Sequence, residues 1–459
     1  MSAPSAPRTP STLDERNDAD EHAFVRHPHR TMLALSFPVL LSLIAEPLTG
    51  LADTAFVARL GATPLAALGV ATVLLSSIFW VFNFLGIGTQ TAVARAHGGR
   101  QPRDAAEAIA TALLTALVLG TTLAIVAWPF LDALVQFMGA GGELRADAIA
   151  YLRIRFLGAP AVLVTIVAFG ALRGVQDMRT PLRIAVAVNV ANVILDALLI
   201  FGAGPVPALG VAGAAWATTV SQVAGAVWAV LAARRVLGPL ARVRLRGVLA
   251  LLVVGRDLVL RTGLLLLFVL LATRAATLAG PDSGAAHQAI RQVWMLTALV
   301  LDAYAATAQT LVGYFLGARR TALARRVAAV GCRWGVATGV LLAVAMLASR
   351  EQVAWLLVPT AAQAAFASAW TVAALAQPLN ALSFVTDGVH WGTGDFRWLR
   401  NAMLLATASG AVALAMIDVH GARALLDVWL VTAAWIAIRA AFGIVRVWPG
   451  VGSAPLARF

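Results

Sequence analysis

The chain has 459 residues, of which 60% are hydrophobic and only 12% charged, and its formal net charge is +13. An ordinary soluble domain has about 25% charged residues, so this composition excludes one. Apolar segments long enough to cross a bilayer, which takes roughly 20 residues, recur along the whole chain. The composition therefore predicts a polytopic α-helical membrane protein.

The first segment differs from the rest. Residues 1–30 are rich in Pro, Ser and charged side chains and contain no apolar core, so they match neither a signal peptide nor a span. We expect a disordered cytoplasmic tail there, and a second short cytoplasmic tail at 447–459.

The apolar runs that follow predict twelve transmembrane helices in two lobes of six. The expected lobes are an N-lobe at 31–235 and a C-lobe at 247–446, joined by a cytoplasmic linker at 236–246. The expected spans are 31–58, 64–92, 104–129, 146–172, 180–202, 210–233, 247–279, 283–314, 322–347, 361–391, 398–419 and 423–446. Prolines are expected to bend or interrupt some of these spans, namely Pro38, Pro47, Pro160 and Pro378.

Arginines lie mainly in alternate connections between these spans, and the chain has no lysine. Positive charge marks the cytoplasmic side, which predicts that both termini are cytoplasmic. The connection at 202–210, GAGPVPALG, lies on the opposite side and has no arginine. We expect no nucleic-acid binding, because the arginines are spread over short loops rather than gathered on one basic face.

The two lobes resemble each other in sequence. The segment 171–179, ALRGVQDMR, falls on 389–397, VHWGTGDFR, after a shift of 218 residues. A shift of 219 residues matches Gly61 with Gly280, Gln90 with Gln309, Gly98 with Gly317, and Arg100 with Arg319. Six spans in each repeat predict a parallel duplication, in which two bundles enclose a cavity and provide alternating access.

Acidic residues within the spans are the strongest functional signal. A carboxylate near the middle of a spanning helix costs about 2.5–3.5 kcal/mol on insertion scales, so a functional role is the default interpretation. Asn192 and Asp196 are four residues apart and share one helix face, and Asp53 is expected at a similar depth. The repeat places Ala272 and Leu414 at the equivalents of the two acids, so the fold itself does not require them. These three residues could bind a proton or a sodium ion.

Other charged residues leave alternatives open. Asp53 could instead pair with Arg59, although six residues is off the helix-face spacing. Glu46, which precedes Pro47, either lines the cavity or forms a hydrogen bond at a kink. Arg261 is expected to extend towards a membrane interface.

Two acidic residues in the spans of the second lobe have no acidic counterpart at the matching positions of the first lobe. Asp302 and Asp387 are expected in the cytoplasmic half of the membrane, where they could receive a cationic substrate or a proton. A structural hydrogen bond to a neighbouring helix is the alternative for both.

Enzymatic motifs are absent. Without lysine no GxxxxGK[ST] loop can form, and there is no HExxH motif and no Cys/His cluster. We therefore expect a transporter rather than an enzyme, with no cofactor beyond a coupling ion.

Several segments resemble one transporter family in combination. They are LALSFPVLLSLIAEPLTGLADTAFVARLGATPLAALG (33–69), ALRGVQDMRTPLRIAVAVNVANVILDALLIFG (171–202), GVAGAAWATTVSQ (210–222) and QPLNALSFVTDGVHWGTGDFRWLRNAML (377–404). They are similar to the multidrug and toxic compound extrusion (MATE) transporters, in particular to the branch named for DNA-damage-inducible protein F (DinF). This resemblance implies twelve helices in two lobes and export of cationic or amphipathic compounds in exchange for protons or sodium.

The resemblance also implies roles for individual residues. The coupling-ion site of the family falls on Asp53, Asn192, Asp196 and Thr218, with Na⁺ at the first three as the alternative to a proton. The candidate residues of the substrate cavity are Glu46, Asp302, Asp387 and Gln309. Gln309 stands where many relatives of this branch carry an acid.

These observations predict a monomeric H⁺- or Na⁺-coupled antiporter that exports organic cations across a bacterial cytoplasmic membrane. A flippase for lipid-linked oligosaccharides is the alternative, and it would require arginines inside its cavity. A polytopic structural or assembly protein is a second alternative, for which neutralising Asp53 would affect no flux.

Overall fold

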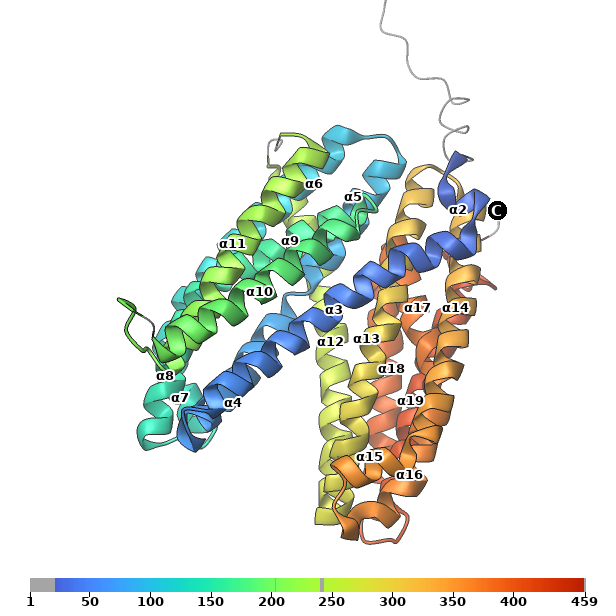
Figure 1. Cartoon of the computed structure of the whole chain (residues 1–459). Helices are drawn as coiled ribbons and strands as arrows, with labels where there is room; N and C mark the ends of the chain where they lie inside the picture. The colour runs from blue at the N-terminus through green and yellow to red at the C-terminus, as the bar shows by residue number, and fades with distance from the viewer. Residues whose placement is uncertain (1–20, 203, 240–242, 458–459) are drawn as a thin grey trace, which may run out of the picture.

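The computed structural model describes residues 21–202, 204–239 and 243–457, apart from the Glu46 side chain. These residues form helices and connecting turns, and contain no β-strand. Figure 1 shows two helical bundles that meet at one end and separate at the other. The two lobes expected from the sequence are confirmed.

Nine α-helices form the described part of the N-lobe. They are α3 (Pro28–Ala58), α4 (Ala62–Val81), α5 (Phe84–Gly98), α6 (Pro102–Ala127), α7 (Leu131–Phe137), α8 (Gly142–Leu157), α9 (Ala159–Gly174), α10 (Arg179–Phe201) and α11 (Val211–Leu237), with the 3-10 turn η1 (Trp128–Phe130) between α6 and α7.

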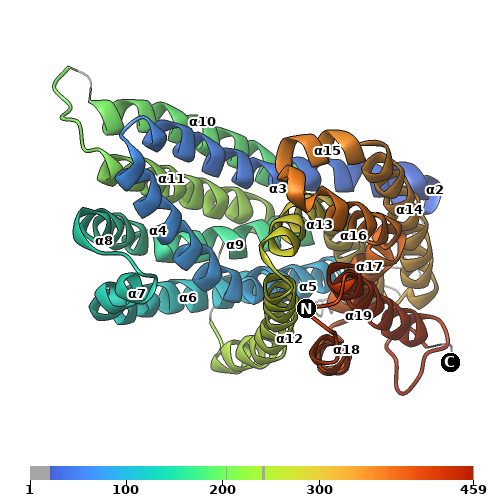
Figure 2. The ribbon, with the colours of Figure 1, turned by 90° about the horizontal axis from the view of Figure 1, so that it is seen from below.

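The C-lobe follows the same plan. Its helices are α12 (Leu245–Leu278), α13 (Pro281–Gly317), α14 (Thr321–Ala348), α15 (Arg350–Leu357), α16 (Gln363–Leu375), α17 (Gln377–Thr393), α18 (Phe396–Ala415) and α19 (Ala424–Val447), with the 3-10 turn η2 (Thr360–Ala362) before α16. Figure 2 shows the bundles side by side, with α3, α5 and α13 where they meet.

The expected spans correspond to this architecture, but some are divided. The pairs α4–α5, α8–α9 and α16–α17 each occupy one expected span, and α8 and α9 are bent by 48° relative to each other. Pro160 and Pro378 lie in the first turns of α9 and α17. Proline is tolerated there because the first N–H groups of a helix have no partner within it.

The backbone supports the internal duplication. The glycines before α4 and α13, Gly61 and Gly280, have positive φ angles of 124° and 110°. Arg100 and Arg319 also have positive φ angles, 52° and 56°, in the turns after α5 and α13. Positive φ is uncommon for a residue with a side chain. Its recurrence at the matched positions indicates the same turn in both lobes.

The expected tail at 1–30 requires a correction. Residues 1–20 lie outside the described residues, but Ala23–Arg26 form helix α2 and α3 already begins at Pro28. Phe24 is fully buried and packs against Phe315, with ring centroids 5.8 Å apart. This apolar contact orders a segment whose composition suggested disorder.

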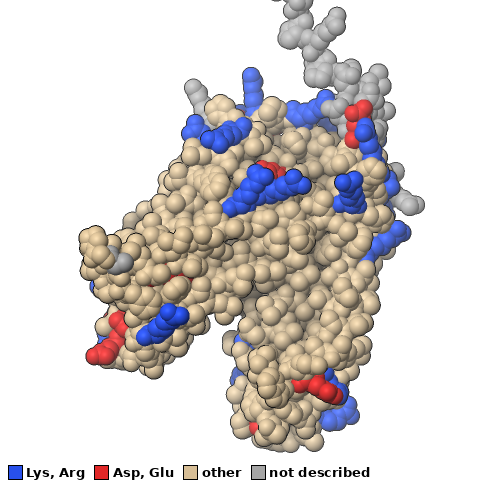
Figure 3. Space-filling model, in the orientation of Figure 1, with Lys and Arg blue, Asp and Glu red and all other residues tan. Residues whose placement is uncertain are grey.

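The outer surface suits a membrane. Large apolar side chains such as Leu117, Ile125 and Leu341 are exposed on the outside of the bundles. On the face drawn in Figure 3, uncharged surface covers most of both lobes, and the charged side chains gather largely towards the ends. Figure 3 also shows a deep opening between the lower ends of the lobes, which we call the notch.

Candidate functional site

Three N-lobe helices bring the predicted ion-site residues together. Asp53 comes from α3, Asn192 and Asp196 from α10, and Thr218 from α11. All four side chains are buried, with Asp53 7% and Asp196 0% exposed. We call these four residues the N-lobe cluster.

Asn192 connects the cluster. With its amide nitrogen towards the acids, it donates to Asp53 Oδ1 at 2.9 Å and to Asp196 Oδ2 at 3.3 Å. Its oxygen then accepts from the hydroxyl and the backbone N–H of Thr218, at 3.2 and 3.3 Å. In the opposite orientation of the Asn192 amide, its nitrogen donates to Thr218 Oγ1 at 3.2 Å, and its oxygen faces the two carboxyl groups. The second orientation gathers oxygen atoms that only a shared proton or a cation would hold together.

The charge balance of the cluster is unusual. The Asp53 and Asp196 carboxyl groups lie within hydrogen-bonding reach of each other. Asp196 Oδ1 is buried without a hydrogen-bond partner among the described atoms. Neither acid forms an ion pair within the described residues, and Arg59, the alternative partner of Asp53, is not paired with it there. Two unpaired carboxyl groups in one buried site favour uptake of a proton or cation.

Sequence reasoning missed two neighbours of the cluster, both on α8. Tyr151 is buried beside the cluster and interacts electrostatically with Asp53 and Asp196. Arg155 is also buried, donates to Gln222 Oε1 at 2.9 Å, and acts on Asp53 through space. These residues could have been found only by knowing that this face of α8 packs against α11.

The oxygen atoms of the N-lobe cluster also determine how a sodium ion would be bound. Among the described residues no three His, Cys, Asp or Glu side chains gather to hold a metal ion. A sodium ion in the N-lobe cluster would therefore need the Asn192 or Thr218 oxygen in addition to the two carboxylates. Such an all-oxygen set suits a hard cation.

The C-lobe acids have a different environment. Asp387 on α17 is held between Arg261 of α12 and Arg439 of α19, with Arg439 Nη2 at 2.9 Å. The expectation that Arg261 extends to an interface is wrong, because this ion pair draws the side chain inwards. Asp302 on α13 interacts electrostatically with Arg261 and with Arg173 of the N-lobe. Asp387 thus forms ion pairs with two arginines, whereas the acids of the N-lobe cluster form none within the described residues and Arg155 acts on Asp53 only through space.

The remaining cavity candidates lie elsewhere. Gln309 is at the contact between the lobes, where its amide nitrogen donates to the Ile87 carbonyl oxygen at 2.8 Å and to Thr91 Oγ1 at 2.9 Å. Gln90 makes the matching contacts in the other direction, at 2.8 and 2.9 Å. Gln309 therefore joins the two lobes in this structure. The Glu46 side chain lies outside the described part of the structure.

Comparison with known proteins supports this architecture. The family profile described as MatE matches residues 38–198 and 259–417, one match in each lobe. The chain is 31% identical over 446 residues to Protein DETOXIFICATION 44, chloroplastic, of Arabidopsis thaliana, covering 92% of this chain and 84% of that protein. It is 28% identical over 435 residues to DNA damage-inducible protein F of Escherichia coli, covering 93% of each. A crystal structure of MATE in the bent conformation superposes with a TM-score of 0.83 at 24% identity, covering 91% of this chain and 94% of the other.

Proposed function

Because the chain belongs to the MatE family of membrane transporters, we propose that it is an H⁺- or Na⁺-coupled antiporter whose ion site is the N-lobe cluster. Members of this family are multi-pass secondary transporters of small molecules rather than enzymes. The observation that carries the coupling proposal is the burial of Asp53 and Asp196 within reach of each other, without an ion-pair partner among the described residues.

Helix α3 links the proposed ion site to both lobes. Its later part carries Asp53 and packs on α10, where Asn189 donates to the Ala45 carbonyl oxygen at 2.7 Å. Its earlier part packs on the C-lobe, where Ser36 donates to Thr307 at 3.0 Å. Binding of an ion at Asp53 would therefore change the position of a helix that is attached to both lobes. Competition between ion and exported compound then follows from linked affinities.

We place the chain in a bacterial cytoplasmic membrane with both termini in the cytoplasm. The turns after α5 and α13 carry arginines, and they lie at the end where the lobes meet and where α2 and the C-terminus are found (Figure 1). Arginine-rich connections mark the cytoplasmic side. In this orientation the notch opens to the outside, and rocking of the lobes would open the cytoplasmic side in turn.

The exported compounds are proposed to be amphipathic. The sequence suggested organic cations, with Asp302 and Asp387 as their acceptors. Both acids are accompanied by arginines, which weakens their attraction for a cation. We also propose that the transporter acts as a monomer, because the lobes that border the notch belong to one chain (Figure 3).

The flippase alternative is supported by the arginines inside the C-lobe. However, Arg261 and Arg439 share Asp387, which leaves one net positive charge. A lipid-linked pyrophosphate carries at least two negative charges, so the pair matches it poorly. The antiporter remains the better-supported function.

Proteoliposomes test the coupling. The vesicles are loaded with ethidium or with 1-naphthoate, two probes of opposite charge, and a proton or sodium gradient is imposed. We expect gradient-driven flux of at least one probe in the wild type and its loss in Asp53→Asn. The control is Asp132→Asn, at an exposed acid that pairs with Arg145 at 2.5 Å away from the cluster. Equal flux in the wild type and Asp53→Asn would rule out Asp53 as the coupling residue.

A further inference from the structure

Arg155 on α8 is a buried arginine that forms no ion pair within the described residues. It is 7% exposed, and its Nη1 donates to the amide oxygen of Gln222 at 2.9 Å. Its Nε is buried without a hydrogen-bond partner in the part of the chain that the structure describes. A buried charge inside a membrane protein is costly unless an opposite charge compensates it. We therefore examine which acid balances Arg155.

The packing of α8 on α11 places Arg155 one helical turn from the N-lobe cluster. Its partner Gln222 lies four residues after Thr218 on α11, and Tyr151 lies four residues before Arg155 on α8. Four residues correspond to about 6 Å along a helix. Tyr151 is within hydrogen-bonding reach of the Thr218 side chain, and the Thr218 hydroxyl lies 3.5 Å from Asp53 Oδ2. The guanidinium group is thus close to the cluster without touching its carboxyl groups.

The charges of Arg155 and the cluster do not cancel. Arg155 acts on Asp53 through space, and the Asp53 and Asp196 carboxyl groups lie within hydrogen-bonding reach of each other. Acids that interact so closely take up cations as a pair. With both acids ionised, the pair carries two negative charges and Arg155 one positive charge. One bound monovalent cation makes this buried group of charges neutral, whereas the acids alone would need two.

The internal repeat shows that the fold does not require an arginine at this position. The shift of 218 residues, which aligns the breaks before α9 and α17, matches Arg155 with Ala373. Ala373 is fully buried on α16. The counterparts of the two acids, Ala272 and Leu414, are apolar as well. The arginine and the acids therefore occur together in the N-lobe and are absent together from the matched positions of the C-lobe.

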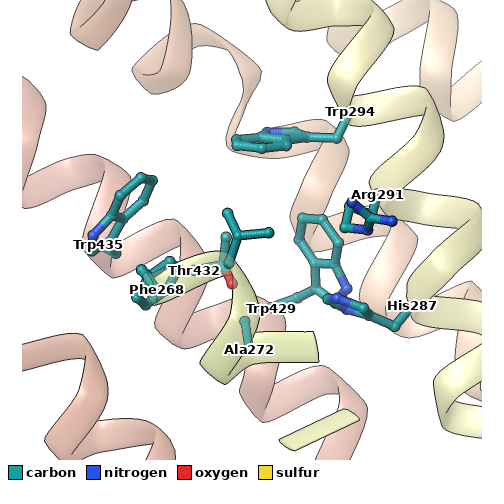
Figure 4. Close-up of a pocket in the computed structure, with 9 residues that line it drawn as sticks. Phe268, Ala272, His287, Arg291, Trp294, Trp429, Thr432 and Trp435 are labelled. Atoms are coloured by element: carbon teal, nitrogen blue, oxygen red, sulfur yellow. The ribbon is translucent and has the colours of Figure 1, made fainter. Parts of the chain in front are cut away.

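Figure 4 shows the surroundings of Ala272, the counterpart of Asp53. Aromatic side chains, among them Phe268 and Trp429, border a cavity of about 20 Å³, which has room for about one water molecule. The lining residues that the structure describes include Arg291 and no acid. This place in the C-lobe lacks the negative charge that attracts a cation, so Arg155 belongs to the charge balance of the N-lobe alone.

We propose that Arg155 is the fixed counter-charge that limits the N-lobe cluster to one monovalent cation. It balances one of the two carboxylates, and the remaining negative charge takes up the H⁺ or Na⁺. An arginine suits this role because a guanidinium group in a protein keeps its proton and therefore does not compete as a proton carrier. The proposal rests on the proposed ion site and defines how many ions that site binds.

Counting bound cations on the purified full-length protein in detergent tests this role. In one Na⁺-containing buffer at neutral pH, protons are counted from the infrared band of protonated carboxyl groups, and sodium from equilibrium dialysis with radioactive Na⁺. The sum of the two is compared between variants, and Asp53→Asn/Asp196→Asn, which has no acid in the cluster, defines zero. We expect one cation in the wild type, two in Arg155→Gln, none in Asp196→Asn, and one in Arg155→Gln/Asp196→Asn.

Two further variants separate the charge of Arg155 from its place in the packing. Arg155→Lys retains the positive charge and should bind one cation, as the wild type does. Arg153→Gln removes a positive charge from an exposed position of the same helix, so it should also bind one. If Arg155→Gln does not fold, Asp196→Asn still decides the question. Asp53 without a counter-charge would hold one cation there, whereas Asp53 balanced by Arg155 holds none.

An unchanged count in a folded Arg155→Gln, or one bound cation in Asp196→Asn, would overturn the proposal. No gradient and no exported compound enter this assay. The expected counts without gradient-driven flux in proteoliposomes would overturn the antiport alone. Coupled flux with an unchanged count in Arg155→Gln would overturn the role of Arg155 alone.

Discussion

Asp53 and Asp387 are both buried aspartates in spanning helices, but their surroundings differ. Asp53 has an amide, a hydroxyl and a second carboxyl group around it, whereas Asp387 lies between two guanidinium groups. Neutralising the aspartate therefore has opposite consequences for stability at the two positions. At Asp53 it relieves repulsion with Asp196, and at Asp387 it leaves two buried arginines without a partner.

This difference predicts how two isosteric substitutions affect stability. Asp387→Asn should lower the free energy of unfolding by about 3–5 kcal/mol, the range for breaking a buried ion pair. Asp53→Asn should leave stability unchanged or raise it. Thermal unfolding can be followed with a thiol-reactive dye, because the single cysteine, Cys332, is buried in the folded state. Similar losses in both variants would contradict the proposed charge balance.

Local spacing predicted only the α10 pair of the N-lobe cluster, whereas Thr218 followed from the family resemblance and the C-lobe ion pairs were not predicted. Asn192 and Asp196 share a face because they are four residues apart on one helix. Arg261 and Arg439 are 126 and 52 residues from Asp387, and each lies on a different helix. A lone arginine in an apolar helix has the same local pattern whether it reaches an interface or a buried acid. Only the packing of α12, α17 and α19 distinguishes these cases.

Helices α5 and α13 cross closely at the contact between the lobes. A Cβ added at Gly98 would overlap the Tyr314 carbonyl oxygen, and one added at Gly317 would overlap the Arg95 carbonyl oxygen. The two contacts are equivalent under the internal repeat, as are those of Gln90 and Gln309. The sequence indicated the matched glycines through the 219-residue shift but not that they face each other. A repeat in sequence does not specify where its symmetry axis runs.

The crossing predicts equal effects from equivalent substitutions. Gly98→Ala and Gly317→Ala should each destabilise the protein by about 1–3 kcal/mol, because a backbone carbonyl cannot move as a side chain can. Gly263→Ala on α12 is the control, since no atom lies within 4 Å of its added Cβ. That change should be neutral or stabilising, as alanine favours a helix. Differential scanning fluorimetry measures all three, and an effect in only one of the two equivalent variants would contradict a symmetric contact.

At the scale of the whole molecule, the segment around α2 connects the two lobes at the end where they meet. The His22 ring packs on Tyr314 and Phe315 of the C-lobe, with centroids 4.8 and 5.2 Å away. Its Nε2 lies 2.9 Å from Gln176 Oε1 in the N-lobe, while its Nδ1 accepts from the Phe24 N–H at 3.0 Å. Nδ1 can accept only when it carries no proton, so these contacts require a neutral imidazole that donates through Nε2. This contact of the α2 segment with both lobes therefore depends on the protonation state of one histidine.

This requirement makes the docking of α2 dependent on pH. Burial lowers the pKa of His22, and repulsion from His97 adds to the shift, although the hydrogen bond to Gln176 opposes it. Because the pKa is lower in the docked state than the free value of about 6.5, the contribution of His22 to docking is complete above that pH and declines as the pH falls below it.

Amide hydrogen exchange of residues 21–27, corrected for intrinsic rates, should be more protected at pH 7.5 than at pH 5.5. His22→Phe retains a ring against Tyr314 but cannot titrate, so it should remove this difference. His420→Gln, at an exposed loop residue, should preserve it. Equal protection of the wild-type segment at both pH values would show that α2 docking does not depend on the protonation of His22.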